Sequence, residues 1–332
     1  MFLPLSVVNA TRLALIATLA ATACAAQAGE PVAFPTKPIK IVVPFGPGGA
    51  VDVAARLLGK HMSATFNQQV VVENKPGAGE LIGVRHVIGS PADGHTLLLG
   101  AAGGITINPI LNKDAGYDPE KALTAVSIIV RAPNVLVVSS DFPASSVAEL
   151  IAYAKKHPGE LTYSSSGVGT IQHVTGAVFN EVAGIDVRHV PYSGAPQATL
   201  DVATKRVTMT YASPASIKPF VARGELKTLA VVMSERYPML PDLPTVKESP
   251  GMGGYDVESW FGLFAPGGTP PAVVQKLNAE VQRIMQLPEV TKTLTETAGM
   301  PARTTPEQAQ QFVHDEIAKY RQVLKTANVV LE

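Results

Sequence analysis

The sequence predicts an α/β fold with two domains, mostly parallel sheets and a cleft between the domains. Short apolar runs that suit strands alternate with amphipathic runs that suit helices, as in folds built on a parallel sheet. The first apolar run has no polar alternation, which is typical of a strand buried on both faces. A block of strand, Gly-rich loop, helix and strand also occurs twice, at residues 39–79 and 160–196.

Each element of the first block has its own signal. An apolar strand ends at Phe45, and apolar residues then recur at helical spacing from Val51 to Met62. Two loops of small residues, Lys75–Gly79 and Ala101–Gly104, are expected further along. The expected elements are strand Lys40–Phe45, helix Val51–Met62, strand Gln69–Asn74, helix Leu81–Ile88 and strand His95–Gly100.

The second block repeats this order around a glycine loop, Gly167–Thr170. Two further helices are expected near the end of the chain, and Thr304 or Thr305 is the candidate N-cap of the last one. The expected elements are strand Val135–Ser139, helix Val147–His157, strand Leu161–Ser165, helix Gln172–Val182, strand Val187–Pro191, helix Gly194–Ala203, strands Val207–Tyr211 and Leu226–Val232, and helices Pro270–Met285 and Pro306–Lys325.

The N-terminus has the pattern of a secretory signal peptide, residues 1–28. Arg12 precedes an apolar run, Leu13–Ala23, that is too short to span a bilayer, and Ala26-Gln27-Ala28 suits cleavage after Ala28. A lipid anchor on Cys24 is the alternative, because the preceding residues loosely resemble a lipobox. Cys24 is the only cysteine, so a cleaved chain has no disulfide, and the bacterial periplasm is the expected location.

Composition limits the classes of function. The 27 basic residues balance the 27 acidic residues, so the chain lacks the basic surplus of a nucleic-acid binder. Beyond the signal peptide no apolar stretch is long enough to cross a membrane. A mature chain of about 300 residues is long enough for two domains. We expect the first domain at residues 30–130 plus 251–332 and the second at 131–250, with two crossings that permit hinge closure.

The two glycine loops predict an anion site. Gly46, Gly48 and Gly49 let the backbone approach a ligand closely, and the helix that follows directs its first N–H groups and its positive dipole end toward the same space. The second loop adds serine and threonine hydroxyls. The alternative is a pair of ordinary tight turns. Asp52 is either a first-turn acid or a side chain that hydrogen-bonds the first loop.

Other chemistries fit less well. No Walker A loop or complete dinucleotide fingerprint is present, the seven histidines show no metal-binding spacing, and no Gly-x-Ser-x-Gly elbow exists. We therefore expect no catalytic residue, metal or cofactor. The enzymatic alternative is a periplasmic serine hydrolase that uses a hydroxyl of residues 164–166 with His173 to cleave a small carboxylate ester. Trp260, the only tryptophan, is expected in a core or in the cleft.

Several motifs together resemble those of one family, the extracytoplasmic solute receptors of tripartite tricarboxylate transporters, also called Bug receptors. The stretches that carry the resemblance are PTKPIK (35–40), 41–52, VVENKPGAG (71–79), PADGHTLLL (91–99), Tyr117-Asp118-Pro119, 163–170 with His173, HVPYSG (189–194) and WFGLFAPGGT (260–269).

The resemblance implies a periplasmic-binding-protein-like fold that closes on a small organic carboxylate, held largely by backbone N–H groups and water. It also implies two integral-membrane transporter subunits as partners, and we expect a monomer; a sensor subunit is an alternative role. The implied ligand-binding residues are Phe45, Gly46, Gly48, Gly49, Ala50, Ala101, Gly103, Asn108, Ser165, Ser166, Gly167, Gly169, Thr170, His173 and Ser213.

Some positions depart from the family pattern. Glu80 stands where the family usually has Gly, and Gly46 replaces a common Pro or Ala. Residues 204–208 replace a Gly-Gly turn, and Met209–Ser216 lacks an acidic residue that often follows that strand. We therefore hypothesise that the end of the pocket that determines specificity is unusual and suits a larger or aromatic acid.

Overall fold

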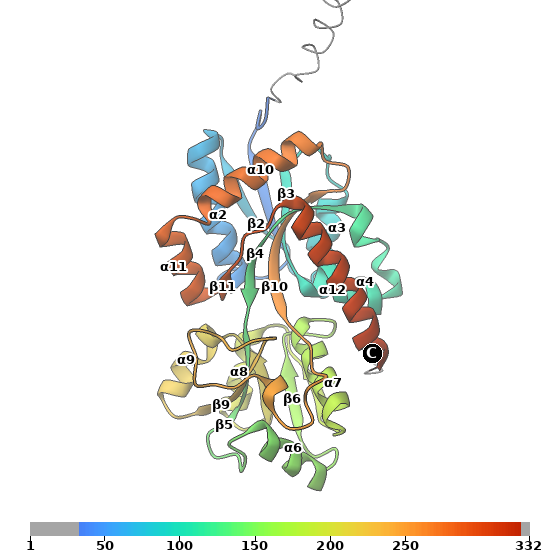
Figure 1. The fold of residues 1–332 in the computed structure, drawn as a ribbon, viewed down its shortest axis with the longest axis vertical. Helices are drawn as coiled ribbons and strands as arrows, with labels where there is room; N and C mark the ends of the chain where they lie inside the picture. The colour runs from blue at the N-terminus through green and yellow to red at the C-terminus, as the bar shows by residue number, and fades with distance from the viewer. Residues whose placement is uncertain (1–32, 327–332) are drawn as a thin grey trace, which may run out of the picture. The chain divides into compact units, whose positions relative to one another are not determined.

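The computed structural model describes residues 33–326, and residues 37–326 form one unit that contains two β-sheets (Figure 1). The predicted signal peptide, the cleavage after Ala28 and the alternative lipid anchor at Cys24 lie outside the described residues.

The first sheet has six strands in the order β11-β4-β10-β3-β1-β2. Strand β1 pairs in parallel with β2 and β3, and β10 pairs antiparallel with both β3 and β4. The bounds are β1 Ile39–Val43, β2 Val70–Asn74, β3 Thr96–Ala101, β4 Leu123–Ala132, β10 Ser259–Pro266 and β11 Met300–Pro301. Strands β3, β4 and β10 are buried along nearly their whole length, because helices cover both faces of this sheet.

The second sheet has five strands in the order β7-β6-β8-β5-β9. Strand β6 pairs in parallel with β7 and β8, whereas β5 pairs antiparallel with β8 and β9. The bounds are β5 Asn134–Ser139, β6 Thr162–Ser165, β7 Arg188–Pro191, β8 Met209–Ala212 and β9 Leu226–Val232.

The α/β fold with two sheets is confirmed, but both sheets are mixed. The parallel character predicted from the repeated blocks is present where those blocks lie, in β1–β2–β3 and β6–β7–β8. Strands β5 and β10 introduce the antiparallel pairs. The chain crosses between the sheets twice, from β4 to β5 and from β9 to β10, so each crossing strand enters its new sheet against the direction of the parallel block.

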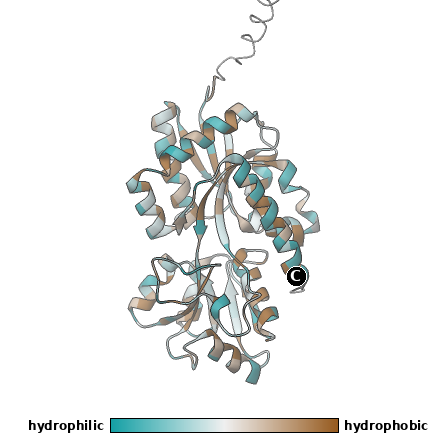
Figure 2. Cartoon of the chain, viewed as in Figure 1, coloured by the Kyte–Doolittle hydropathy of each residue, from teal (hydrophilic) through white to brown (hydrophobic). Residues whose placement is uncertain are grey.

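The predicted helices are present, and α4, α5, α9 and α11 are additional. Helix α10 buries residues at helical spacing, from Val273 to Ile284, and Figure 2 shows hydrophilic and hydrophobic colours alternating along α10 and α12. The N-cap of α12 is Thr305, whose Oγ1 accepts from the Gln308 N–H at 3.2 Å. The bounds are α2 Ala50–Phe66, α3 Leu81–Ile88, α4 Asn108–Leu111, α5 Pro119–Ala122, α6 Val147–Lys156, α7 Ile171–Ala183, α8 Ala195–Ala203, α9 Pro214–Ala222, α10 Pro271–Ile284, α11 Pro288–Thr297 and α12 Pro306–Thr326.

Trp260 is a core residue. Its side chain on β10 is fully buried, and its ring meets Phe264 and Phe312 at centroid distances of 6.3 and 5.4 Å. Its Nε1 donates to Glu316 Oε2 of α12 at 3.0 Å. The indole therefore ties β10 to α12.

Candidate functional site

The first glycine loop, Phe45–Ala50, lies between β1 and α2 and is largely exposed from Gly46 to Gly49. Gly48 has φ +85°, a left-handed conformation that favours glycine. Helix α2 begins after Gly49 with no side-chain cap. A Cβ on Gly46 or Gly48 would meet no atom within 4 Å, and one on Gly49 would meet only the Gly46 carbonyl at 4.0 Å. The start of α2 therefore faces open space.

Asp52 is both a first-turn acid and a restraint on this loop. Its Oδ2 accepts from the Gly48 N–H at 2.9 Å, and its Oδ1 accepts from Asn74 Nδ2 at 2.9 Å. Arg56 donates to both carboxylate oxygens, each at 2.9 Å. Burial acts to raise the pKa of Asp52, but the hydrogen bonds from Arg56, Gly48 and Asn74 outweigh it and lower the pKa. Both interpretations from the sequence hold for the same side chain.

The second loop, Ser165–Thr170, lies between β6 and α7 and is more buried than the first. Gly167 and Gly169 have φ +132° and +78°. Helix α7 follows Thr170, again with no side-chain cap. Several of the loop's polar groups are satisfied within it: Thr170 Oγ1 donates to the Gly167 carbonyl at 2.7 Å, and Ser166 Oγ donates to Gln172 Oε1 at 2.7 Å.

Two stacked histidines form hydrogen bonds with the second loop. The rings of His173 and His189 stack with centroids 4.1 Å apart and planes 23° apart. His173 Nδ1 accepts from the Gly169 N–H at 3.2 Å, and His189 Nε2 lies 2.6 Å from Ser165 Oγ. Burial, with a smaller contribution from His173, lowers the pKa of His189 to about 4. Ser165 therefore pairs with His189 instead of His173, and its side chain is 1% exposed.

The predicted loop at Ala101–Gly104 is instead the end of a strand followed by helical turns. Strand β3 ends at Ala101, and a π-helical turn, η1 Gly103–Ile107, leads directly into α4. The prediction failed because small residues suit a loop and a tightly packed helical turn equally well. Asn108, buried at the start of α4, donates through Nδ2 to the Gly79 carbonyl.

Glu80 was noted in the sequence only as a departure from the family pattern, and the structure places it beside several of the predicted ligand-binding residues. It has φ +80°, is 4% exposed, and directs its carboxyl at the end of β3, where Oε2 accepts from the Ala101 N–H at 3.3 Å. The Gly104 N–H is a second donor. Burial raises the pKa of Glu80 to about 8, although both backbone donors act to lower it. The available signal was an acid standing at a usual glycine position.

Three segments from different parts of the chain meet around Glu80. A Cβ on Gly103 would lie 2.2 Å from Glu80 Oε1 and 3.8 Å from the Gly169 carbonyl oxygen. A Cβ on Gly79 would lie 3.3 Å from the Val168 carbonyl oxygen. The end of β3 and the second glycine loop are thus in close approach, with Glu80 beside both.

The remaining predicted residues are placed differently. Ser213 is the N-cap of α9, where its Oγ accepts from the Ser216 N–H at 3.3 Å. Among the described residues, no hydrogen bond joins Ser213 or the 45–50 loop to the second loop. The structure therefore brings together Ala101, Gly103, Asn108 and Gly169, and leaves the first loop facing open space.

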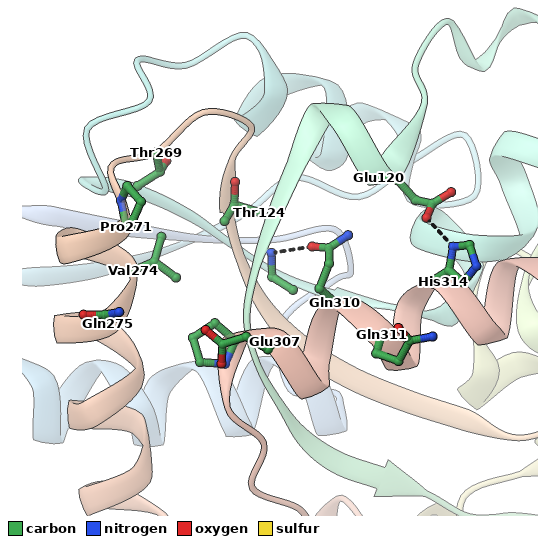
Figure 3. Close-up of a pocket in the computed structure, with 12 residues that line it drawn as sticks. Glu120, Thr124, Thr269, Pro271, Val274, Gln275, Glu307, Gln310, Gln311 and His314 are labelled. Atoms are coloured by element: carbon green, nitrogen blue, oxygen red, sulfur yellow. Dashed lines mark hydrogen bonds and ion pairs between the residues drawn. The ribbon is translucent and has the colours of Figure 1, made fainter.

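A separate groove of about 640 Å³ lies beside β4, α10 and α12 (Figure 3). His314 Nδ1 is 2.7 Å from Glu120 Oε1 at one end of it, and Gln310 accepts from the Ala125 N–H. Its lining contains none of the predicted ligand-binding residues.

The described residues contain neither a candidate metal site nor a candidate membrane-spanning helix. Residues 33–326 contain no group of three or more acidic, histidine or cysteine side chains placed to hold a metal ion. Within the same range no helix is both long and apolar enough to cross a bilayer.

The two mixed sheets, each with a glycine loop that leads into a helix, form a fold of the kind found in periplasmic solute-binding receptors. The chain belongs to the family described as "Tripartite tricarboxylate transporter family receptor", which it matches over residues 54–329. The family resemblance noted in the sequence is therefore confirmed.

Three relatives illustrate the match. Protein BugT of Bordetella pertussis is 31% identical over 98% of this chain and 100% of its own. The structure "R. palustris Rpa4515 with adipate" is 36% identical, has a TM-score of 0.83, and covers 90% of this chain and 99% of its own. "MatC (Rpa3494) from Rhodopseudomonas palustris with bound malate" is 31% identical, has a TM-score of 0.80, and covers 88% and 100%. None of the three is described as a hydrolase.

Proposed function

We propose that the protein is exported to the periplasm, captures a small organic carboxylate and delivers it unchanged to two membrane subunits of a tripartite transporter. The observation that carries this proposal is the start of α2, where an exposed glycine loop precedes a helix without a side-chain cap. Backbone N–H groups and a positive dipole end at such a place bind anions. The relatives described with adipate and malate support a carboxylate as that anion.

In this proposal the ligand lies between the two glycine loops. The other residues that were predicted from the sequence complete its binding site. The two domains, residues 30–130 with 251–332 and residues 131–250, close on it as a monomer. The open space at the first loop and the tight contacts of the second support this division of roles, because a ligand can enter from the first loop and rest against the second.

A thermal-shift screen of the mature chain tests the proposal. Monocarboxylates, dicarboxylates, tricarboxylates, acidic amino acids and aromatic acids form the panel, and mass spectrometry follows the fate of each acid. A ligand at 100 times its Kd stabilises the native state by about 2.7 kcal/mol. Stabilisation by at least one acid, recovered unchanged, is the expected result. If no carboxylate stabilises the protein, the proposed binding site is wrong. If an acid is recovered chemically altered, the proposed receptor function is wrong.

Gly49→Val provides a site-directed check with a matched control. A side chain at Gly49 meets almost nothing in the protein, so the variant should fold but place methyl groups where the ligand approaches α2. We expect its Kd to rise at least tenfold. Gly253→Val is the control, because a Cβ there also meets no atom within 4 Å, far from both loops in sequence. If Gly49→Val and Gly253→Val bind the carboxylate with equal affinity, the ligand does not bind at the start of α2.

A further inference from the structure

The carboxyl group of Glu80 occupies backbone N–H donors at the end of β3, beside residues that are predicted to bind ligand. The Ala101 and Gly104 N–H groups both donate to it, and Gly103 packs directly against Glu80 Oε1. Ala101 and Gly103 are among the residues predicted to bind ligand. At this end of the site the protein supplies its own carboxyl group.

We infer that Glu80 makes the site selective for acids with a single carboxylate, a refinement that rests on the proposed function. One ligand carboxylate can bind at the glycine loops. A second carboxylate that reached the 101–104 segment would find its donors taken and a carboxyl group in its place. Two carboxyl groups in one buried space strongly disfavour ionisation of both. Because Glu80 already takes both backbone donors, the inferred ligand has an uncharged far end.

Charge compensation around Glu80 is weak. Among the described residues no Lys or Arg forms an ion pair with it. Tyr117 packs behind η1 and donates to the Gly104 carbonyl, Arg85 on α3 donates to the Ala115 carbonyl, and His173 on α7 accepts from Gly169. An ionised Glu80 would thus present an uncompensated negative charge to an anionic ligand.

The backbone at Glu80 makes a clean test possible. At φ +80° glycine replaces Glu80 without strain, so Glu80→Gly removes the carboxyl and exposes the Ala101 and Gly104 donors. Glu80→Gln keeps an oxygen that accepts the same two N–H groups but cannot ionise. Asn67→Gly is the matched control, because Asn67 is an exposed residue at φ +48° whose replacement relieves a left-handed conformation without removing a carboxyl.

The experiment compares Kd values for straight-chain acids of equal length with one or two carboxylates, such as hexanoate against adipate, from four to eight carbons. We expect the wild-type protein, Glu80→Gln and Asn67→Gly to prefer the monocarboxylate at least tenfold at pH 6.5. Glu80→Gly should reduce that preference at least tenfold. A wild-type preference for dicarboxylates, or an unchanged ratio in Glu80→Gly, overturns the inference while leaving a carboxylate receptor intact. Absence of binding by every acid overturns the proposed function as well.

A pH series distinguishes the effect of the charge of Glu80 on ligand affinity from the effect of its shape. Since the pKa of Glu80 is about 8, the wild-type affinity for the preferred anion should fall as pH rises from 7 to 9. Glu80→Gln should not show this fall, and because His173, Tyr117 and Arg85 are present in both proteins, the difference between them isolates Glu80. Parallel pH profiles of the two proteins would contradict a charge effect of Glu80 on the ligand.

Discussion

Single side chains set the geometry of the first glycine loop. Asp52 and Asn74 together hold both of its ends: Asp52 accepts from the Gly48 N–H, and Asn74 Nδ2 donates to the Phe45 carbonyl at 3.0 Å. The glycines make the backbone of this loop conformationally flexible, and the hydrogen bonds with Asp52 and Asn74 restrict that flexibility. Preorganisation of this kind lowers the entropic cost of binding.

Asp52→Ala should therefore weaken both stability and binding. The variant removes the charged acceptor of the exposed Gly48 N–H and of the partly buried Asn74 amide, and the loss of these hydrogen bonds costs about 1–3 kcal/mol of unfolding free energy. Because the folded state lowers the pKa of Asp52, this contribution is present above the unfolded pKa near 3.8 and is lost as pH falls through the folded value. Urea unfolding at pH 7 and pH 3 measures the loss of stability and its pH dependence, and the Kd for the carboxylate measures the loss of binding. Glu289→Ala, which removes an exposed first-turn acid of α11, should cost much less.

At the scale of elements, local patterns predicted the two βα units that carry the glycine loops. The expected helix Leu81–Ile88 matches α3 at both ends, and strand Leu226–Val232 matches β9. Glycine loops and apolar periodicity are local properties, so a single sequence reveals them. Strand β10 was expected only as a motif around Trp260, because its pairing with β3 and β4 depends on residues far away in the chain.

The surroundings of Glu80 could not be predicted for the same reason. Glu80 lies beside Gly103 and close to Gly169, and three separate segments must pack before that environment exists. The sequence could identify Glu80 as unusual, but its burial and raised pKa are tertiary properties. Conversely, Ser165 and His173 looked like possible partners in sequence, while the parallel pairing of β6 with β7 brings His189 to Ser165.

The link between β10 and α12 yields a prediction at this scale. Trp260→Phe removes the N–H that donates to Glu316 and leaves a small void in the core. We expect a loss of about 2–4 kcal/mol in unfolding free energy. Glu316→Gln keeps an acceptor for the indole and should cost less. Circular dichroism during urea unfolding checks both, and ligand affinity should stay within twofold; a tenfold loss would place Trp260 in the binding site.

For the whole molecule, the two crossings between the sheets are joined by one arginine. Arg131 on β4 donates to Glu258 just before β10, and also to Glu235 at 2.7 Å and Ser234 at 2.9 Å just after β9. In the proposed closure of the two domains, these segments would be the hinge. The guanidinium then limits how far the two connections can move independently.

Arg131→Met should loosen this connection. Glu258 is 8% exposed and would lose its cation, and since Arg131 itself is partly exposed we expect a cost of about 1–3 kcal/mol. The ligand-free protein should also become more open, which small-angle X-ray scattering detects as a larger radius of gyration. Arg223→Met removes an exposed pair with Glu225 and is the control for both readouts. An unchanged scattering profile in Arg131→Met would contradict a hinge role.

The position of β10 also governs the order in which the chain can fold. Strands β3 and β4 do not pair with each other; β10 fills the place between them although it emerges much later from the ribosome. Contacts of such long sequence separation form slowly. A chain that is synthesised or threaded from its N-terminus therefore carries a first sheet with its middle missing until Ser259–Pro266 arrives. In the proposed export to the periplasm, a polypeptide that completes its core late would stay extended while it crosses the membrane.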